Sequence, residues 1–499
     1  MFGMANLPTA IYSAAQVRAL DRYAIEQLAI PGYTLMTRAG SAALRALRRR
    51  WPKAKHIVVV CGSGNNAGDG YVLARLARQA GMKVTTFALF EPNSLRGDAL
   101  TAYRDFVAAG GQAIAWLDSV VERAEVIVDA IFGTGLSRPL DAMLSKRVQA
   151  MNAASAPILA LDIPSGIDAD TGLVLGSAIT ANCTIALVGL KLGFYLGVAP
   201  DHIGELEFDD LEISTDTKVE MTARRLDEQW LQSVLPRRSR LAHKGSNGQV
   251  LVIGGGIGMA GAARLAGEAC LRVGAGLVTV ATRFENVAAI VTERPELIVR
   301  AVDVVDELQP LIARADVIAI GPGLGQDEWA RKLFDCALQS DKPLIVDADA
   351  LNLLSLQPRK QSNWILTPHP GEAARLLASS SSAIQQDRLA SVQMLEKKYG
   401  GIVVLKGANT LIALENELPA ICDRGNPAMA TPGMGDVLTG VIAGLLAQMK
   451  DAWMAARAGV LAHAMAGDLA AANLGSSIER GVIASDLFAQ LPACVNRDE

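Results

Sequence analysis

Short apolar segments alternate with amphipathic helical segments along almost the whole chain. Apolar segments of about four to eight residues, rich in Val and Ile, are typical of strands buried on both faces, and helices are the usual connections between parallel strands. The pattern therefore predicts parallel sheets covered by helices, which is an α/β fold. The expected strands are 56–61, 83–90, 126–132, 158–161, 184–188, 249–254, 277–281, 316–320, 344–347 and 402–405.

Two domains are expected, because 499 residues are too many for one hydrophobic core. The expected strands form two sets, each about the size of one doubly wound sheet, and the two sets carry different glycine motifs. Residues 205–225 separate them, and this segment is rich in Asp, Glu and Thr, so no apolar strand is expected in it. We place the boundary near residue 220, which gives domains 1–220 and 221–499.

Charge and cysteine usage exclude several classes of function. The net charge is −4 and the basic clusters are confined to 48–50 and 237–240, which argues against a nucleic-acid partner. No apolar stretch reaches the roughly 18 residues of a membrane span, and residues 1–10 lack the pattern of a secretion signal. The six cysteines and five histidines are scattered, so a zinc site is not expected. We expect a reduced, cytoplasmic homo-oligomer that acts on small molecules and has no membrane partner.

The most informative motif is TPGMGDVLTG at 431–440. Gly433, Met434 and Gly435 can direct successive backbone N–H groups into one concavity, and a helix beginning near Asp436 adds the positive end of its dipole. This combination predicts an anion site, for example for a phosphate. A carboxylate repels an anion, so we interpret Asp436 as a base that takes a proton from a hydroxyl. The alternative is that Asp436 only caps the helix 437–449.

In the first half, a glycine loop with two asparagines follows the strand 56–61. The loop reads GSGNNAGDG and satisfies G-x-G-x-x-A, which is a weak dinucleotide signal when it stands alone. The amides of Asn65 and Asn66, together with Asp69, suit a ligand that both donates and accepts hydrogen bonds, or a cation with oxygen ligands. A helix is expected over 71–78, after the loop. The alternative to a ligand site is a tight turn held by the Asn side chains.

Two further loops, 129–139 and 161–168, are expected at the same edge of the sheet, where ligands of open α/β sheets bind. Asp162 ends an apolar strand and is a candidate for proton transfer, or it braces the turn before Pro164. Asn66, Asp129 and Ser165 all offer oxygen atoms to a hard cation.

The motifs GSGNNAGDG, DAIFGTGL and LDIPSGID together resemble the NAD(P)H-hydrate epimerase domain over residues 1–215. The resemblance implies a Rossmann-like domain that interconverts the R and S hydrates of NADH and NADPH, with Asp162 as a catalytic residue in contact with the substrate. It also implies that Asn66, Asp129 and Ser165 bind K⁺. The implied substrate-site residues are Asn65, Asn66, Ala67, Gly68, Asp69, Gly133, Thr134, Gly135, Leu136, Ser137, Arg138 and Pro139. Ala67 stands where the family usually has Gly.

Five motifs follow strands of the second half: GGGIGMAG at 254–261, GPGLG at 321–325, DADALN at 347–352, TPHPGE at 367–372 and KGANT at 406–410. The last offers a cation, a flexible backbone and a hydroxyl to nucleotide phosphates, although it is not a Walker loop. It also fits a hairpin turn, and both interpretations can hold. His369 is interpreted either as a hydrogen-bonded strut or as a ligand contact.

GPGLG, DADALN, TPHPGE, KGANT and PGMGD together resemble the ADP-dependent NAD(P)H-hydrate dehydratase domain over residues 230–499. The resemblance implies a ribokinase-like fold that converts the S hydrate to NAD(P)H while ADP is split to AMP and phosphate, with Mg²⁺. The implied nucleotide-binding residues are Lys406, Gly407, Ala408, Asn409, Thr410 and Gly435. The implied hydrate contacts are Ala262, Gly323, His369 and Asp436, and Asp436 is the implied catalytic residue.

An epimerase joined to a dehydratase is chemically coherent, because hydration produces both epimers and the dehydratase takes only one. We therefore predict a bifunctional enzyme of metabolite repair. Asp436 would take the proton of the substrate hydroxyl as this attacks the terminal phosphoryl group, after which phosphate leaves more easily than hydroxide. The alternative is a ribokinase-like vitamin or sugar kinase with a non-catalytic N-terminal binding domain.

Overall fold

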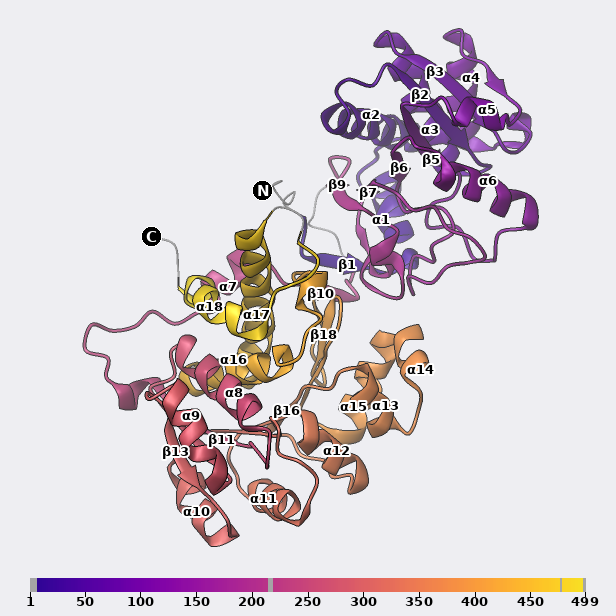
Figure 1. Ribbon diagram of the computed structural model, residues 1–499. Helices are drawn as coiled ribbons and strands as arrows, with labels where there is room; N and C mark the ends of the chain where they lie inside the picture. The colour runs from indigo at the N-terminus through magenta and orange to yellow at the C-terminus, as the bar shows by residue number, and fades with distance from the viewer. Residues whose placement is uncertain (1–6, 214–218, 476–477, 497–499) are drawn as a thin grey trace. The chain divides into compact units, whose positions relative to one another are not determined.

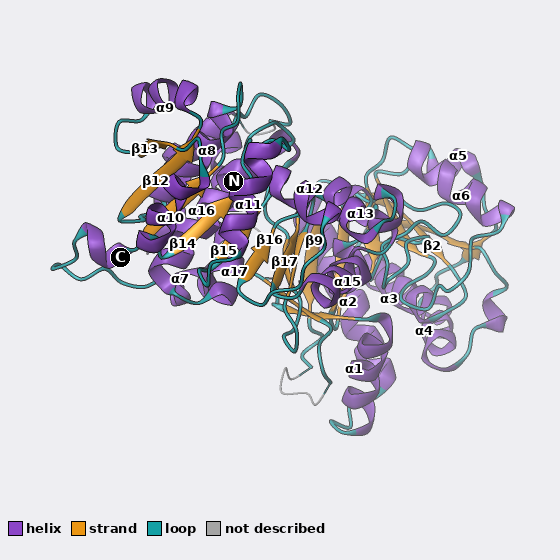
Figure 2. Ribbon diagram, turned by 90° about the horizontal axis from the view of Figure 1, so that it is seen from below, coloured by secondary structure: helices purple, strands orange, loops and turns teal. Residues whose placement is uncertain are grey.

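A computed structural model describes residues 7–213, 219–475 and 478–496, and the chain divides into two compact units, Phe2–Ala223 and Arg224–Glu499. We call them the N-terminal unit and the C-terminal unit. In each, parallel strands are flanked by α-helices (Figures 1 and 2), which confirms the expected α/β class. Among the described residues, no helix combines the length and the apolar character that a membrane span requires.

The N-terminal unit is built on a parallel sheet in the order β4-β3-β2-β5-β6-β7-β9. Its first six strands follow the doubly wound order in which the chain starts in the middle of the sheet and winds outward in both directions. Its strands are β1 (Ala10–Tyr12), β2 (His56–Cys61), β3 (Lys83–Ala88), β4 (Ala113–Ile114), β5 (Val126–Ala130), β6 (Ile158–Leu161), β7 (Cys183–Leu187), β8 (Leu190–Lys191) and β9 (Glu205–Asp209). Its α-helices are α1 (Ala14–Glu26), α2 (Gly32–Arg50), α3 (Asn65–Gln79), α4 (Gly97–Ala108), α5 (Asp118–Val121) and α6 (Ala142–Ala153).

The two faces of this sheet are covered by two separate hydrophobic cores. Successive side chains of a strand point to opposite faces, so β2 contributes Ile57 and Val59 to one core and Val58 and Val60 to the other. Helices α2, α3 and α4 complete the first core, and α5 and α6 complete the second. This explains why the strand sequence HIVVVC is apolar throughout rather than alternating.

The C-terminal unit repeats this plan with the sheet order β13-β12-β11-β14-β15-β16-β17-β18-β19-β10. The sheet is parallel from β13 to β17, and β18 runs antiparallel to both β17 and β19, so KGANT is the turn of a hairpin, as one interpretation expected. Its strands are β10 (Ala223–Arg225), β11 (Gln249–Ile253), β12 (Leu277–Thr282), β13 (Ile298–Ala301), β14 (Val317–Ile320), β15 (Leu344–Val346), β16 (Trp364–Leu366), β17 (Ile402–Leu405), β18 (Thr410–Ala413) and β19 (Ala420–Cys422). Its α-helices are α7 (Glu228–Val234), α8 (Ala260–Arg272), α9 (Val287–Glu293), α10 (Val305–Arg314), α11 (Glu328–Leu338), α12 (Ala348–Leu356), α13 (Pro370–Leu377), α14 (Ser381–Gln386), α15 (Arg388–Tyr399), α16 (Met434–Met449), α17 (Ala452–Leu474) and α18 (Leu487–Val495).

Helix α16 is buried against α8 and α17, because it is apolar on nearly every side. Small residues allow this close packing: a Cβ atom on Gly440 would collide with the carbonyl oxygen of Ala266 on α8. The packing fixes the first turn of α16, which carries the Gly433–Asp436 motif.

The described part of residues 205–225 holds no apolar strand, as expected, but it does contain two polar strands that the sequence did not indicate, β9 and β10. Strand β9 reads ELEFD, and its acidic residues hide the strand pattern. These acids pair with the basic end of α2: Glu205 with Arg50, Glu207 with Arg49, and Asp209 with Arg45. The cluster of arginines in α2 is thus used largely within the N-terminal unit.

Candidate active sites

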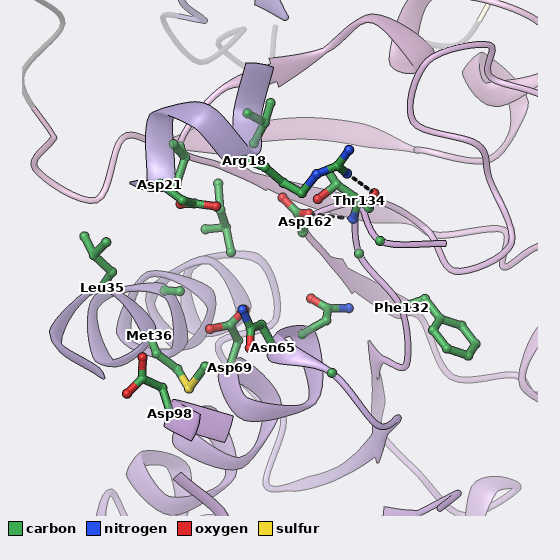
Figure 3. A pocket seen from close by; sticks show the side chains of 18 of the residues that line it. Arg18, Asp21, Leu35, Met36, Asn65, Asp69, Asp98, Phe132, Thr134 and Asp162 are labelled. Atoms are coloured by element: carbon green, nitrogen blue, oxygen red, sulfur yellow. Dashed lines mark hydrogen bonds between the residues drawn. The ribbon is translucent and has the colours of Figure 1, made fainter. Parts of the chain in front are cut away.

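A cavity of about 460 Å³ lies at the carboxyl ends of the central strands of the N-terminal unit (Figure 3). Helices α1, α2 and α3 and the loops after β5 and β6 supply its walls. Its polar lining residues are Arg18, Asp21, Ser63, Asn65, Asn66, Asp69, Asp98, Thr134 and Asp162.

The asparagine pair belongs to the first turn of α3. Gly64 is the extended N-cap and the helix begins at Asn65, so the alternative of a tight turn held by the Asn side chains is wrong, and the helix expected over 71–78 begins six residues earlier. The helical periodicity places Asn65, Asn66 and Asp69 at the cavity. Ala67 belongs to the hydrophobic core, and a Cβ on the neighbouring Gly68 would approach Met36 on α2. The cavity lining therefore omits these two members of the expected set, and the methyl group of Ala67 is accommodated in the core.

The loop after β5 reaches the cavity with its first half only. Gly133–Leu136 line the cavity, whereas Ser137, Arg138 and Pro139 are exposed outside the lining. The Thr134 N–H donates to Asp162 Oδ2 at 3.3 Å, and Arg18 Nη1 on α1 donates to the Thr134 carbonyl oxygen at 2.9 Å. A Cβ on Gly133 would come within 2.8 Å of Asp162 Oδ2, so a side chain at this position would displace the Asp162 carboxylate.

Asp162 forms an ion pair with Lys191, a residue that sequence reasoning missed. The Lys191 side chain is fully buried, and its ammonium also donates to the Leu187 carbonyl oxygen at 2.8 Å. Asp162 itself adopts a positive φ of 67°, a conformation that costs a non-glycine residue energy and often marks a functional site. One signal could have identified Lys191: it is the only charged residue in the apolar run 183–200, and a buried charge requires a partner.

Four carboxylates line this cavity, those of Asp21, Asp69, Asp98 and Asp162, and the buried ammonium of Lys191 is paired with the last of them. Burial raises the pKa of Asp69 well above its usual value of 3.8, and Asp162 and Asp21 raise it further. Burial, followed by the charge of Asp162, raises the pKa of Asp21 to about 6. In Figure 3, Asp162 lies beside Thr134 and Arg18, while Asp69 lies beside Asn65 across the cavity. The cavity thus holds carboxyl groups in different protonation environments, which is the arrangement that acid–base catalysis uses.

Asp129 and Ser165 are joined directly behind this cavity. Ser165 Oγ donates to Asp129 Oδ1 at 2.6 Å, and the Ser165 N–H donates to Asp129 Oδ2 at 2.8 Å. Burial raises the pKa of Asp129 to about 6. The side-chain amide of Asn66 is buried, and among the described residues neither its oxygen nor its nitrogen has a hydrogen-bond partner. An unpartnered buried carbonyl oxygen next to a cavity is the kind of atom that a bound cation satisfies.

A second polar cluster lies at the carboxyl ends of β15, β16 and β17 in the C-terminal unit. Lys406 Nζ is 2.6 Å from Asp347 Oδ1 and 3.8 Å from Glu372 Oε2. Thr439 on α16 donates to the other oxygen of Asp347 at 2.7 Å. The motifs DADALN, TPHPGE and KGANT therefore meet in space with helix α16, although 92 residues separate Asp347 and Thr439.

Asp436 lies in the first turn of α16 and does not cap it. The helix begins at Met434, and its N-cap is Gly433, whose φ of 88° places it in the left-handed region that glycine tolerates. The capping interpretation of Asp436 is therefore wrong. Burial, followed by the charge of Asp347, raises the pKa of Asp436 to about 7, and Lys406 partly opposes this. Asp436 is thus positioned as a base that titrates near neutral pH.

The expected nucleotide residues Lys406 and Gly435 are neighbours. A Cβ on Gly435 would lie 3.3 Å from Lys406 Nζ. Burial alone would lower the pKa of Lys406, but Asp347 and Glu372 raise it, so the ammonium is retained. Thr410 Oγ1 donates to the Gly407 carbonyl oxygen at 3.0 Å, which closes the hairpin turn that also contains Ala408 and Asn409.

His369 is a hydrogen-bonded structural residue, as one interpretation expected, and half of its side chain is accessible to a ligand. Its Nδ1 accepts from the Gly371 N–H at 2.9 Å and so caps α13, while Nε2 is 3.4 Å from Glu372 Oε1 and half of the side chain is exposed. Burial, followed by Lys406, lowers its pKa. Burial raises the pKa of Glu372 to about 7. Glu372 was not among the expected site residues, although it stands in the TPHPGE motif.

Ala262, in the first turn of α8, and Gly323, in the loop after β14, lie in contact. A Cβ on Gly323 would be 3.0 Å from Ala262 Cβ, and the Gly256 N–H donates to the Gly323 carbonyl oxygen at 2.6 Å. These residues follow β11 and β14, the strands next to the carboxylate cluster in the sheet. The glycine loops therefore form a backbone wall at the same sheet edge as Asp347.

Comparisons with known proteins match both units. A family model described as NAD(P)H-hydrate dehydratase matches residues 250–492, and one described as YjeF-related protein N-terminus matches residues 32–193. The chain is 47% identical to the bifunctional NAD(P)H-hydrate repair enzyme of Coxiella burnetii, over 98% of this chain and 100% of the relative. It is 44% identical to the enzyme of that name from Escherichia coli, over 98% of this chain and 95% of the relative. Among solved structures, the ADP/ATP-dependent NAD(P)H-hydrate dehydratase of Bacillus subtilis, co-crystallized with ATP/Mg²⁺, is 30% identical, with 55% of this chain and 98% of that chain covered and a TM-score of 0.49.

The relatives match along both units rather than along the C-terminal unit alone. A vitamin or sugar kinase with a non-catalytic N-terminal domain is therefore not supported. The expected bifunctional repair enzyme is confirmed, together with its Rossmann-like and ribokinase-like α/β classes. The chain belongs to the family of bifunctional NAD(P)H-hydrate repair enzymes.

Proposed function

We propose that the N-terminal unit epimerises the hydrates of NADH and NADPH in its cavity and that the C-terminal unit dehydrates the S form at the cluster around Asp436. The observation that carries the first assignment is the ion pair of Asp162 and Lys191 in a cavity that also holds Asp69. The observation that carries the second is a base with a pKa of about 7 in the first turn of a helix.

Epimerisation inverts the hydroxylated carbon of the nicotinamide ring. The hydroxyl must leave from one face, helped by the lone pair of the ring nitrogen, and water must return on the other face. One proton has to reach the departing oxygen, and another has to leave the incoming water. Asp69, with its raised pKa, carries the first proton, and Asp162, which is paired with Lys191, accepts the second.

We assign K⁺ to Asn66, Asp129 and Ser165. The donor set fits this ion, because it consists of amide, carboxylate and hydroxyl oxygens and includes the unpartnered buried oxygen of Asn66. Bound there, K⁺ supplies a positive charge that satisfies these oxygens and stabilises the loops beside the cavity. The residues of the first turn of α3 and of the loop after β5 then orient the substrate in the cavity.

For dehydration, we propose ADP as the phosphoryl donor, held by Lys406–Thr410 and by Gly435. Asp436 takes the proton of the substrate hydroxyl, whose oxygen bonds to the terminal phosphorus as the bond from that phosphorus to AMP breaks. Phosphate then leaves the ring carbon with help from the ring nitrogen, and loss of a proton from the neighbouring carbon restores the dihydropyridine. Ala262, Gly323 and His369 would contact the hydrate along the adjoining loops.

We assign Mg²⁺ to the nucleotide phosphates rather than to a cage of protein ligands. Among the described residues, no cluster of three or more His, Cys, Asp or Glu could hold a metal, and Lys406 and Thr439 already occupy the two oxygens of Asp347. Mg²⁺ typically binds through substrate phosphates and one or two carboxylates, and it neutralises phosphate charge. This unit therefore fits a metal–nucleotide complex.

The test is to incubate the full chain with a mixture of R and S hydrates, with and without ADP, and to follow the absorbance of the reduced nicotinamide. The wild type should recover both epimers only with ADP. Asp162→Asn should recover the S fraction alone, while Asp436→Asn should bind ADP and interconvert the epimers but recover neither.

Each of the two variants serves as the control for the other. Wild-type recovery by Asp436→Asn would overturn the dehydratase assignment, and wild-type recovery of the R form by Asp162→Asn would overturn the epimerase assignment. The same assay with ATP decides between the two donors. A homo-oligomer stays a prediction, which light scattering on the full chain tests.

A further inference from the structure

Arg388 is a buried guanidinium directly behind the KGANT turn. It is the first residue of α15, and only 4% of it is exposed. Nη2 donates to the Leu405 carbonyl oxygen at 3.2 Å, and both terminal nitrogens make longer contacts, at 3.4 and 3.5 Å, with the carbonyl oxygen of Lys406. A Cβ on Gly407 would come 2.9 Å from Nη1, so the guanidinium abuts the backbone where the turn begins.

This cation has only neutral partners. Nη1 also donates to Gln385 Oε1 at 3.0 Å, and Nε is buried with no hydrogen-bond partner among the described residues. Among the described residues, no carboxylate oxygen lies within 4.0 Å of the guanidinium. Burial alone lowers the pKa of Arg388 to about 10. By contrast, the buried cations of Lys191 and Arg225 are paired with Asp162 and Asp423.

Such an arrangement is costly for the unliganded protein. A buried charge is normally paired, and one without a counter-charge destabilises the folded state. Proteins retain unfavourable arrangements of this kind mainly where a ligand completes them. The missing charge here is an anion, and the adjoining residues, Lys406 to Thr410, are those assigned to the nucleotide.

We propose that Arg388 is a positioning residue of the nucleotide site, whose charge is compensated by the phosphates of the bound nucleotide. The inference rests on the proposed nucleotide role of Lys406–Thr410. Arg388 acts through the protein: it holds the carbonyl groups of Leu405 and Lys406 on the inner side of the turn. The guanidinium thereby fixes the backbone of the turn and adds positive charge beneath the site assigned to the phosphates.

Two properties separate this role from a purely structural one. The loss of affinity on removing the charge should grow with the charge of the ligand, so it should be largest for ADP, smaller for AMP and absent for adenosine. The unliganded protein should not become less stable, because no counter-charge is left unpaired and removing the buried charge offsets the hydrogen bonds that Leu405, Lys406 and Gln385 lose.

The experiment uses the full chain and measures binding of ADP, AMP and adenosine by calorimetry, together with the melting temperature without ligand. Arg388→Met should weaken ADP binding on the order of tenfold or more, leave adenosine unaffected and keep or raise the melting temperature. Arg388→Lys keeps a cation but not the planar guanidinium group, so its affinity for ADP should lie between those of Arg388→Met and the wild type. The control is Arg294→Met, which removes one of the three arginines paired with the buried Glu268; it should lower the melting temperature and leave ADP binding unchanged.

The outcomes are distinct. An equal loss of affinity for ADP and adenosine, or a lower melting temperature of Arg388→Met with unchanged ADP binding, would show a structural role only and overturn the inference. If the wild type bound ADP no more tightly than adenosine, the assignment of Lys406–Thr410 to the nucleotide phosphates would itself be overturned. A loss that scales with ligand charge, without a loss of stability, supports the proposal.

Discussion

Replacing Asp436 with asparagine should make the unliganded protein more stable at neutral pH while it removes dehydration. Burial, together with the charges of Asp347 and Asp349, raises the pKa of Asp436 to about 7, against 3.8 for an unperturbed aspartate. The reaction needs the ionised form of Asp436, and the folded protein stabilises this form less than the protonated one. Asparagine keeps the shape of the side chain and removes this charge.

The sign and the size follow from proton linkage. Between pH 3.8 and about 7 the folded state keeps a proton on Asp436 that the unfolded chain has released, so the stability of the wild type falls as pH rises through this window. At about 1.36 kcal/mol per pKa unit, the full difference corresponds to about 4 kcal/mol. The variant should thus match the wild type near pH 4 and exceed it by up to about 4 kcal/mol above pH 7. The dehydration rate of the wild type should rise with pH through about 7, because the base must be ionised.

Chemical denaturation at pH 5 and pH 8 measures the stability difference, and the hydrate assay across the same range measures the rate. Four of the six tryptophans belong to the C-terminal unit, and the buried Trp329 and Trp364 make fluorescence a signal of its unfolding. Asp341→Asn, at an exposed position, is the control and should change neither quantity. A stability difference between Asp436→Asn and the wild type that is the same at both pH values would refute the reasoning, as would a rate that is flat from pH 5 to 8.

Three other perturbations have defined outcomes. Lys191→Met leaves Asp162 without its cation and should cost about 3–5 kcal/mol of stability in denaturation while it abolishes recovery of the R hydrate; recovery at the wild-type rate would contradict the role of the pair. Replacing K⁺ with Li⁺ should slow epimerisation and spare dehydration of the S form, and Asn66→Ala should lose the dependence on K⁺; equal epimerisation rates in both salts would remove the assignment. Gly440→Ala places a methyl group against the carbonyl oxygen of Ala266 and should lower stability by about 1–3 kcal/mol, which a melting curve detects; an unchanged curve would mean that the two helices separate at no cost.

The sequence predicted the sheet centres and the convergence of the loops for a physical reason. Strands such as β2 and β11 are buried on both faces, so their residues are apolar without interruption and stand out from the helices around them. Because parallel strands place their carboxyl ends at one edge, loops that follow them must meet, as Ser165 and Asp129 do.

What the sequence could not predict depends on pairing between distant residues. Strand β9 was missed because its acids are neutralised by arginines of α2, about 155 to 164 residues away, and such pairing leaves no local pattern. Lys191 was missed for the same reason, since its partner Asp162 lies 29 residues earlier. The start of α3 at Asn65 depends on the extended Gly64, whose conformation local propensity does not specify. Among the described residues, Arg388 has no acidic partner that a sequence pattern could indicate.

Strand β9 also determines where the sheet of the N-terminal unit stops. As the last strand in the order, it offers N–H and C=O groups along its free side to any other extended chain, which is the usual route to unwanted association. Glu205 and Glu207, which pair with α2, disfavour the addition of another strand to the free edge of β9. Such a strand would have to place its side chains next to these charges. Exchanging Glu205 and Glu207 for apolar residues would strengthen the strand pattern in the sequence and, at the same time, make the folded protein prone to aggregation.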